Sequence, residues 1–388
     1  MKENQYLFVK SRNETREFYR QIDQIFKNEK EISDNFTKNT LKKEILNLIR
    51  RKREKNEIIN KEDCKLIKKS LLEYETVEYK IFKEIKGCVI TSVNPIKIND
   101  LTFYNWPGHK KNIIENNSLA FKKKYPSFYD PKISKTLLSI KVKAKEYQKA
   151  YEIVDDKFKK IENILRYLFT HTNHSTNGSN TYDIGIFEFR QYDWLETMDI
   201  SNNSIGGISG STGTHRTLKL NKKSLLNKNN VSRIWEILNK PYPNPNKIES
   251  RLLNSIEWIG KAKHEMEQQK AFIQYFIAIE SLMNFDPKGT ISPSVTYQIR
   301  EYVSFLLGKN IDERIEIQNL FTRLYDIRSS IVHGNITNFT IYDLEDARNM
   351  AENLIIKFLT HPELKNINSE NDFKQLKDLI TVKKFGRK

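Results

Sequence analysis

The spacing of apolar residues is helical but broken over residues 1–82, where Pro and Gly are absent. The apolar positions that show this spacing are Ile45, Leu48, Ile49, Ile59, Ile67, Leu71 and Leu72. The residues between them are mostly polar or charged. We therefore expect a basic helical segment over 1–82.

Short runs of β-branched and aromatic residues replace this pattern over 83–240, separated by turn signals such as Asn94-Pro95 and Gly206-Gly207. The runs predict strands at 88–93, 101–104, 137–142, 184–189 and 216–220. An amphipathic stretch from about Lys143 to Phe169 predicts one long helix among the strands. We interpret 83–240 as a mixed α+β domain.

Two local motifs in this domain suggest ligand sites, but their spacing does not support them. The stretch from Ser204 to Gly213 is rich in Gly and Ser but lacks the GxxxxGK[ST] pattern of a phosphate loop, so we expect a mobile loop. His171-Thr172-Asn173-His174 offers two imidazoles without an acidic or Cys partner at ligand spacing. We expect a polar loop there and no metal site.

Helical spacing returns after a hinge. Pro241, Pro243 and Pro245 predict an extended linker over 241–249. Helices are then predicted at 247–284 (broken near Lys261), 294–307, 312–333 and 343–359. Four antiparallel helices with short connections describe an all-α bundle over 250–362, followed by a basic, disordered tail over 363–388. The expected fold class is α+β and multidomain: an N-terminal helical and mixed α+β region, then a C-terminal all-α bundle.

The charge balance of the chain indicates which class of partner the protein binds. The 388 residues include 66 Lys and Arg against 49 Asp and Glu, a formal net charge of +17. Such an excess favours an anionic partner, nucleic acid before membrane, although an AT-rich genome explains part of it through its Lys-rich composition. The run Arg50-Arg51-Lys52-Arg53 is the candidate RNA-binding patch. The alternative is a solvated helix face that Glu44, Glu54 and Glu57 partly neutralise.

The cysteine spacing and the lengths of the apolar runs predict the cellular compartment of the protein. Cys64 and Cys88 have no CxxC spacing, so they indicate neither a zinc site nor a disulfide framework, and a reducing cytosol fits. The first residues have no apolar core of signal-peptide length, and no apolar run approaches the roughly 20 residues of a membrane span. We expect a cytoplasmic protein that uses no metal or cofactor.

An arginine and a histidine stand near the end of the predicted 312–333 helix, with four residues between them. The predicted core stripe of this helix consists of Ile317, Leu320, Leu324, Ile327 and Ile331. It leaves Arg328 and His333 facing a surface or a partner subunit. On an ideal helix the two residues are about 140° and about 7.5 Å apart, so they do not stack on one face. Gly334 at the expected C′ position lets the last turn unwind, so that both heads reach one phosphate.

Ordinary helix-end roles compete with this interpretation. His333 has the alternative role of a charged cap, since many helices end in a basic residue followed by Gly. Arg328 has the alternative of a surface salt bridge to Asp326 or Glu345. The spacing of the pair alone does not decide between these roles and chemistry.

Two sequence segments of the predicted bundle form a recognisable combination. The first is Ala278-Ile279-Glu280-Ser281-Leu282-Met283, and the second runs from Leu324-Tyr325-Asp326-Ile327-Arg328 to His333-Gly334-Asn335. Their combination resembles the Apea-like branch of the HEPN superfamily over about 250–362, whose defining element is an Arg and a His with four to six residues between them. The resemblance implies a small helical bundle that dimerises about a two-fold axis and cleaves RNA without a metal, in defence against phage or in toxin systems.

The resemblance also implies roles for single residues. Arg328 and His333 would be catalytic, with the copies from two subunits in one composite cleft. Glu280 aligns with an acidic residue that some members use near the cleft, and the alternative is an ion pair with Lys270 or Arg300.

Two further positions near the motif bear on catalysis. Active members often carry Asn, Asp or His after the arginine, where this chain has Ser329, whose hydroxyl can still donate a hydrogen bond to a phosphate. Asn335 would either contact RNA or cap the helix end.

The residues and the resemblance together predict a homodimeric, metal-independent endoribonuclease that forms 2′,3′-cyclic phosphate ends. The 83–240 domain would select the RNA or sense a phage-derived trigger, and a neutralising partner is also expected. The alternative is a non-catalytic module in which the bundle dimerises and the basic surface binds RNA.

Overall fold

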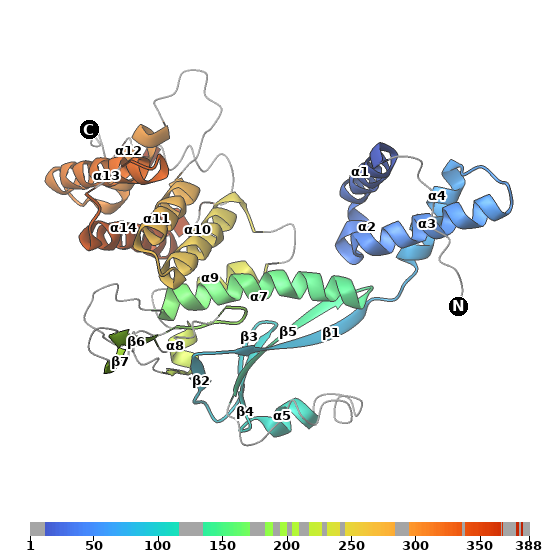
Figure 1. The fold of residues 1–388 in the computed structure, drawn as a ribbon, viewed down its shortest axis with the longest axis horizontal. Coiled ribbons are helices and arrows are strands. Elements are labelled where there is room, and N and C mark those ends of the chain that lie inside the picture. Colours follow the sequence, from blue (N-terminus) through green and yellow to red (C-terminus); the bar gives the residue numbers. More distant parts are fainter. Residues whose placement is uncertain are drawn as a thin grey trace. The chain divides into compact units, whose positions relative to one another are not determined.

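The computed structural model describes residues 12–115, 135–170, 183–188, 195–199, 204–208, 217–226, 231–240, 245–283, 295–335, 338–365, 367, 378–379 and 382. The protein is mixed α+β with a helical C-terminal part, as predicted (Figure 1). It forms two compact units. The first contains the residues up to Ile81 together with Ile140–Lys157, and the second contains Phe82–Ser139 and the residues from Phe158 onward. The second unit thus includes residues of both the predicted 83–240 and 250–362 regions.

The helical prediction for the N-terminal region is confirmed for the described residues up to position 72. The helices are α1 (Arg12–Asn28), α2 (Lys30–Asn35), α3 (Lys38–Glu54) and α4 (Lys61–Leu72). Their shared core consists of Ile32, Phe36, Leu41, Leu48, Ile67 and Leu71. Thr37 caps the start of α3 by accepting the N–H of Thr40. Asn60 and Asp63 form a capping box at the start of α4.

The helical prediction is wrong beyond position 76, because strand β1 (Val77–Ile85) begins there. Val77, Tyr79 and Ile81 alternate with Glu78 and Lys80, which is the two-residue period of a strand. The predicted boundary between 1–82 and 83–240 therefore falls inside a strand.

β1 belongs to a four-stranded sheet in the order β1-β5-β4-β3. The other strands are β3 (Ile96–Ile98), β4 (Leu101–Trp106) and β5 (Lys135–Ala144). β3 and β4 are antiparallel. Lys141 pairs with Glu78 at 2.9 Å and Lys135 pairs with Glu84 at 3.2 Å, so β1 and β5 also run in opposite directions.

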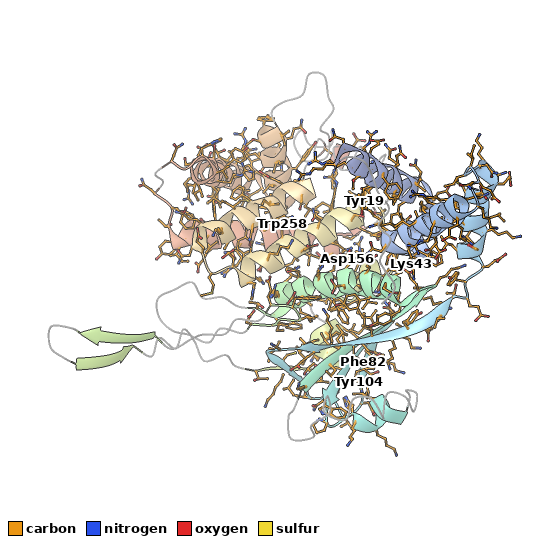
Figure 2. All side chains as sticks on the ribbon, turned by 45° about the vertical axis from the view of Figure 1, so that its right-hand side comes forward. Tyr19, Lys43, Phe82, Tyr104, Asp156 and Trp258 are labelled. Atoms are coloured by element: carbon orange, nitrogen blue, oxygen red, sulfur yellow. The ribbon has the colours of Figure 1, made fainter. Side chains whose placement is uncertain are left out.

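A buried histidine, His109, fixes the turn that follows β4. His109 Nδ1 accepts the N–H of Asn105 at 2.9 Å, and its Nε2 lies 3.1 Å from the carbonyl oxygen of Ser92. The chain then enters α5 (Lys110–Glu115). On the strand itself, Tyr104 contacts Phe82 of β1 with ring centroids 6.0 Å apart (Figure 2).

The remaining strands form two-stranded sheets. β2 (Cys88–Ile90) pairs in parallel with β8 (Leu218–Leu220), and β6 (Leu195–Asp199) pairs antiparallel with β7 (Ser204–Ile208). The predictions of strands at 88–93, 101–104, 137–142 and 216–220 are confirmed in position, whereas β1, β3, β6 and β7 were not predicted.

Two interpretations of this region are wrong. The described residues 183–188 contain no strand, only an isolated bridge between Gly185 and Lys86, so the strand predicted at 184–189 is not found there. The stretch from Ser204, expected to be a loop, begins with β7, and its residues 209–213 lie outside the described part of the chain.

The predicted long helix is confirmed as α7 (Tyr147–Phe169). It starts four residues later than expected because β5 continues to Ala144 and therefore includes Lys143. Two short helices follow later in the chain, α8 (Lys222–Leu226) and α9 (Val231–Leu238).

The C-terminal part is helical. Its helices are α10 (Lys247–His264), α11 (Gln268–Met283), α12 (Val295–Leu307), α13 (Ile311–Val332), α14 (Ile341–Thr360) and α15 (Pro362–Lys365). α10 packs against α11 and α14, and α12 packs against α13. The break between α10 and α11 falls at residues 265–267, just after the predicted one. Leu364 and Ile367 are buried, so the start of the disordered tail at 363 is wrong.

Across the described ranges, no helix is long and apolar enough to cross a membrane.

α7 and α10 approach each other at a glycine. Gly260 of α10 faces the backbone of Asn163 so closely that a methyl group on Gly260 would overlap its carbonyl group and Cα. Gly260 therefore sets the distance between the two helices.

We predict that Gly260→Ala lowers the free energy of unfolding by about 1–3 kcal/mol, because the backbone of Asn163 cannot turn aside as a side chain can. This loss is net of the roughly 1 kcal/mol that Ala gains over Gly within a helix. Urea unfolding measures the change. Gly108→Ala is the matched control, since its methyl group would meet the nearest atom, of Asn105, at an ordinary 3.6 Å. Equal midpoints for the two variants would contradict the close helix contact.

Candidate functional site

Arg328 lies on the buried side of α13. It follows Phe321 by seven residues and Leu324 by four, spacings that return to the same helix face. Phe321 and Leu324 are the fully buried side chains of this helix, while Leu320 and Ile327 of the predicted stripe are half-buried. Leu324 of the predicted stripe is confirmed as buried, but the observed buried side is rotated toward Phe321. The expectation that Arg328 faces outward is wrong.

The inward guanidinium meets a carboxylate of α11. Arg328 Nη2 lies 3.4 Å from Oε1 and 3.5 Å from Oε2 of Glu280, and the two side chains are 24% and 27% exposed. The guanidinium carbon also lies 5.8 Å from the centre of the Tyr325 ring. Arg328 Nε is buried and has no hydrogen-bond partner among the described residues. Arg328 thus has a donor to spare.

The ion pair differs from the pairings that the sequence suggested. The alternative for Glu280 was an ion pair with Lys270 or Arg300, but Lys270 pairs with Glu267 at 2.6 Å. Arg300 lies 3.5 Å from the hydroxyl of Thr322.

Burial raises the pKa of Glu280, and the nearby positive charge of Arg328 lowers it by less. The ionised carboxylate is therefore less favourable in the folded protein than in water. The contacts with Arg328 are long, which agrees with this incomplete compensation.

His333 is the C-cap of α13, and its side chain is exposed. Gly334 has φ +71°, so the left-handed C′ residue is confirmed. The N–H of Gly334 donates to the carbonyl of Ile331 at 3.1 Å, and the N–H of Asn335 donates to that of Ser330 at 2.9 Å. This is the bond pattern of a Schellman motif. Asn335 thus closes the helix through its backbone, and the motif holds the imidazole in solvent at the helix end.

One chain presents the two motif residues in different surroundings. Arg328 faces α11, whereas His333 faces solvent beyond the last turn. Ser329 is half-buried between them in sequence, and its carbonyl accepts the N–H of His333 at 3.0 Å. A single chain offers one guanidinium with a spare donor and one exposed imidazole.

The basic residues of the α3 run differ in whether they form ion pairs. Lys52 pairs with Glu57 at 3.0 Å and with Asp63 at 2.9 Å. The side chains of Arg50, Arg51 and Arg53 are exposed, and no ion pair joins them to other described residues. The predicted RNA-binding patch therefore loses Lys52 to internal pairing.

A metal site was not expected at the two imidazoles of 171–174. His171 and His174 lie outside the described residues. Among the residues that are described, no group of three His, Cys, Asp or Glu side chains is placed to hold a metal ion.

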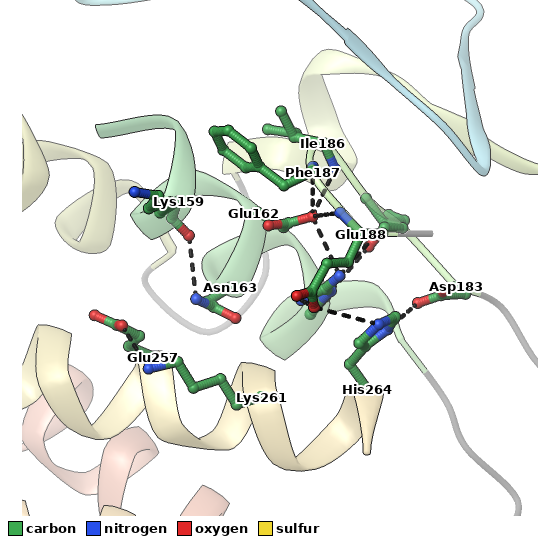
Figure 3. Close-up of polar contacts among 12 residues, drawn as sticks. Lys159, Glu162, Asn163, Asp183, Ile186, Phe187, Glu188, Glu257, Lys261 and His264 are labelled. Carbon is green, nitrogen blue, oxygen red and sulfur yellow. Dashed lines mark hydrogen bonds and ion pairs between the residues drawn. The ribbon is translucent and has the colours of Figure 1, made fainter. Parts of the chain in front are cut away.

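A buried polar cluster around α7 was missed by the sequence analysis (Figure 3). Glu162 Oε1 accepts the N–H groups of Ile186 at 2.7 Å, Phe187 at 3.0 Å and Glu188 at 3.2 Å. Arg166, one turn along α7, lies 3.1 Å from the same oxygen and donates to the carbonyl of Glu188 at 2.8 Å. The backbone of 186–188 is satisfied by a side chain, which explains why no strand forms there.

The end of α10 completes this cluster. His264 Nδ1 lies 3.1 Å from Asp183 Oδ1, and Asp183 is almost fully buried. Lys263 of the same helix is buried and contacts the carbonyl of Tyr167 at 2.7 Å and Glu352 at 2.8 Å. A usable signal was present in the sequence, since Glu162 and Arg166 stand four residues apart within the apolar side of the predicted helix.

Comparisons of the chain with protein-family models, with curated proteins and with solved structures found no match.

We predict that Glu280→Gln stabilises the protein more at about pH 7.5 than at about pH 4. The raised pKa of Glu280 means that its ionised form costs stability in the fold, and this cost disappears as the pH falls through that pKa and both states become protonated. Gln mimics the protonated form at every pH. Urea midpoints of wild type and variant at the two pH values measure the difference.

Glu316→Gln is the control for this experiment, because Glu316 is exposed on α13. A stability difference for Glu280→Gln that stays the same at both pH values would contradict the unfavourable burial of the Glu280 charge.

Proposed function

We propose that the protein is a metal-independent endoribonuclease whose C-terminal helices form a HEPN-like bundle. The observation that carries the proposal is the state of Arg328, a half-buried guanidinium with long contacts to its carboxylate and a buried Nε that lacks a described partner. Such a group is suited to bind an oxyanion with two parallel hydrogen bonds. The exposed His333 imidazole at the end of the same helix adds a group that transfers protons near neutral pH.

The reaction that fits these groups is attack of an RNA 2′-hydroxyl on the adjacent phosphate. A base removes the proton of the 2′-hydroxyl, and the oxygen forms a bond to phosphorus. The bond from phosphorus to the 5′-oxygen breaks, and an acid protonates that oxygen as it leaves. The products are a 2′,3′-cyclic phosphate and a 5′-hydroxyl, and the guanidinium offsets the charge that develops on the phosphate.

This reaction needs more than one chain supplies. It uses two imidazoles, as base and acid, and each chain has one His333. A two-fold pair of bundles supplies a second His333 and a second Arg328. The active form is therefore a homodimer, and the proposed site is composite.

The biological setting follows from a broad ribonuclease activity. Cleavage of cellular RNA stops growth, which suits a toxin or an abortive defence against phage. The region 83–240 would then receive the phage-derived trigger or select the RNA, and a neutralising partner would keep the enzyme silent until then.

A second candidate is a non-catalytic module that dimerises and binds RNA. The observation that favours it is the pairing of Arg328 with Glu280, together with Ser329 at the position after the arginine. In this case, RNA binds to the protein and stays intact.

We predict that purified protein cleaves single-stranded RNA in EDTA and leaves 2′,3′-cyclic phosphate ends. Arg328→Ala and His333→Ala should each lower the rate by at least about 100-fold, because one removes the charge stabilisation and the other the proton transfer. Gel analysis of end-labelled RNA before and after phosphatase treatment measures both the rate and the ends.

His361→Ala is the matched control, since His361 is the C-cap of α14 as His333 is of α13. It should retain the wild-type rate. Binding without cleavage by wild type would support the non-catalytic module, and equal rates for all four proteins would attribute the activity to a contaminant.

A further inference from the structure

The first compact unit contains a groove that the proposed cleavage site does not use. It lies between α3 and α4 and has a volume of about 430 Å³, within the range of roughly 300–1,000 Å³ that is typical of small-ligand sites. Its charged lining comprises Glu44, Arg51, Lys52, Lys55, Glu57 and Asp63. The groove adjoins the basic run Arg50-Arg51-Lys52-Arg53, two of whose residues line it.

The rest of the groove is largely apolar. Leu48 and Ile67 line it and are 8% exposed each, as part of the core between the helices. Leu66 also lines it but is 62% exposed. An exposed leucine beside two buried apolar residues offers a surface on which a flat, weakly polar group can pack.

The charges of the groove are not all available to a ligand. Lys52 is held by Asp63 and Glu57, and the hydrogen bonds to these two carboxylates raise the pKa of Lys52. Asp63 also accepts the backbone N–H of Asn60 at 2.9 Å. Lys52 with its two carboxylate partners carries a net charge of −1, and Arg51 and Lys55 with Glu44 carry +1, so the lining as a whole is neutral. The positive charge is concentrated at Arg51 and Lys55, which no ion pair joins to other described residues.

Helical geometry separates the basic residues of α3 into two sets. Arg51 and Lys55 are four residues apart and share one face, and both line the groove. Arg50 is turned about 100° from Arg51 around the helix, and Arg53 about 160°. Arg50 and Arg53 do not line the groove. The run Arg50-Arg51-Lys52-Arg53 is therefore not one binding surface.

We propose that this groove binds single-stranded RNA, with one unstacked base against Leu48, Leu66 and Ile67 and the flanking phosphates on Arg51 and Lys55. A polyanion suits a chain of net charge +17, and the free cations flank an apolar surface, as in sites where bases pack while the backbone is neutralised. A duplex hides its base faces and would leave the apolar surface uncovered. The proposal deepens the ribonuclease function by naming where the substrate strand is held.

The test is a comparison of charge reversals at neighbouring positions. In the full-length His333→Ala protein, which leaves RNA intact, Arg51→Glu and Lys55→Glu should each weaken binding of a labelled 12-nucleotide RNA by about tenfold and reduce the salt dependence of binding by about one phosphate contact or more. Arg50→Glu changes the net charge equally at an adjacent residue but should weaken binding less than about threefold at 150 mM salt, because distant charges are screened. Fluorescence anisotropy measures the affinities.

Two other ligands test whether a base packs in the groove and whether the groove prefers a single strand. A strand with abasic sites, which keeps its phosphates, should bind about tenfold more weakly, and a duplex of the same length should bind more weakly than the single strand. Equal losses from Arg50→Glu and Arg51→Glu would overturn the groove and indicate a diffuse charge effect. Undiminished affinity for the abasic strand would overturn the packing of a base.

The outcomes separate this proposal from the ribonuclease activity. If wild type cleaves RNA while Arg51→Glu and Lys55→Glu bind and cleave normally, the groove proposal fails and the enzyme proposal stands. If the groove variants lose binding but wild type never cleaves, the enzyme proposal fails and the groove stands. Thermal unfolding of each variant, expected to match wild type because both side chains are exposed, verifies the fold.

Discussion

The close approach of α7 and α10 is the constraint on which the second compact unit depends. Gly260 lets α10 pass next to the backbone of Asn163, and one turn later Lys263 reaches the carbonyl of Tyr167 and the carboxylate of Glu352. Lys263 is buried, so its charge is tolerable only with these partners. A wider separation of α7 and α10 would therefore remove the Tyr167 carbonyl from the buried Lys263, which would keep only its Glu352 partner on α14, and would leave a gap in the packing.

This fixed α10 supports α11, and two carboxylates show how differently the unit treats buried charge. Glu162 accepts three backbone N–H groups and lies against Arg166, so its contacts hold the segment 186–188 in place. Glu280 of α11 has long contacts with Arg328, and burial raises its pKa. The first arrangement serves stability. The second keeps a charge in an unfavourable place, which is typical of residues retained for a function.

The sequence predicts the elements of this fold better than their faces. In α13, Leu324 has apolar neighbours on both sides, Leu320 and Ile327 on one and Phe321 on the other, so periodicity cannot decide which side faces the core. Packing against α11 and α12 decides it, and with it the direction of Arg328. Likewise, the apolar run at 184–189 resembles a strand, but the side chain of Glu162, far away in sequence, takes its backbone N–H groups. The end of α13 was predictable because Gly334 acts locally.

In the proposed site, phosphate binding at Arg328 affects the protonation of Glu280. If an RNA phosphate takes the guanidinium of Arg328, Glu280 loses the positive charge that offsets part of its burial. Its pKa must then rise further, since the cause that lowers it has been neutralised while burial remains. Phosphate binding and proton uptake at Glu280 are therefore linked, and each promotes the other. When Glu280 loses Arg328 as its partner, it takes up a proton and becomes neutral. The half-buried Arg328 can therefore change from an internal ion pair to a substrate contact, and no unpaired charge is left behind.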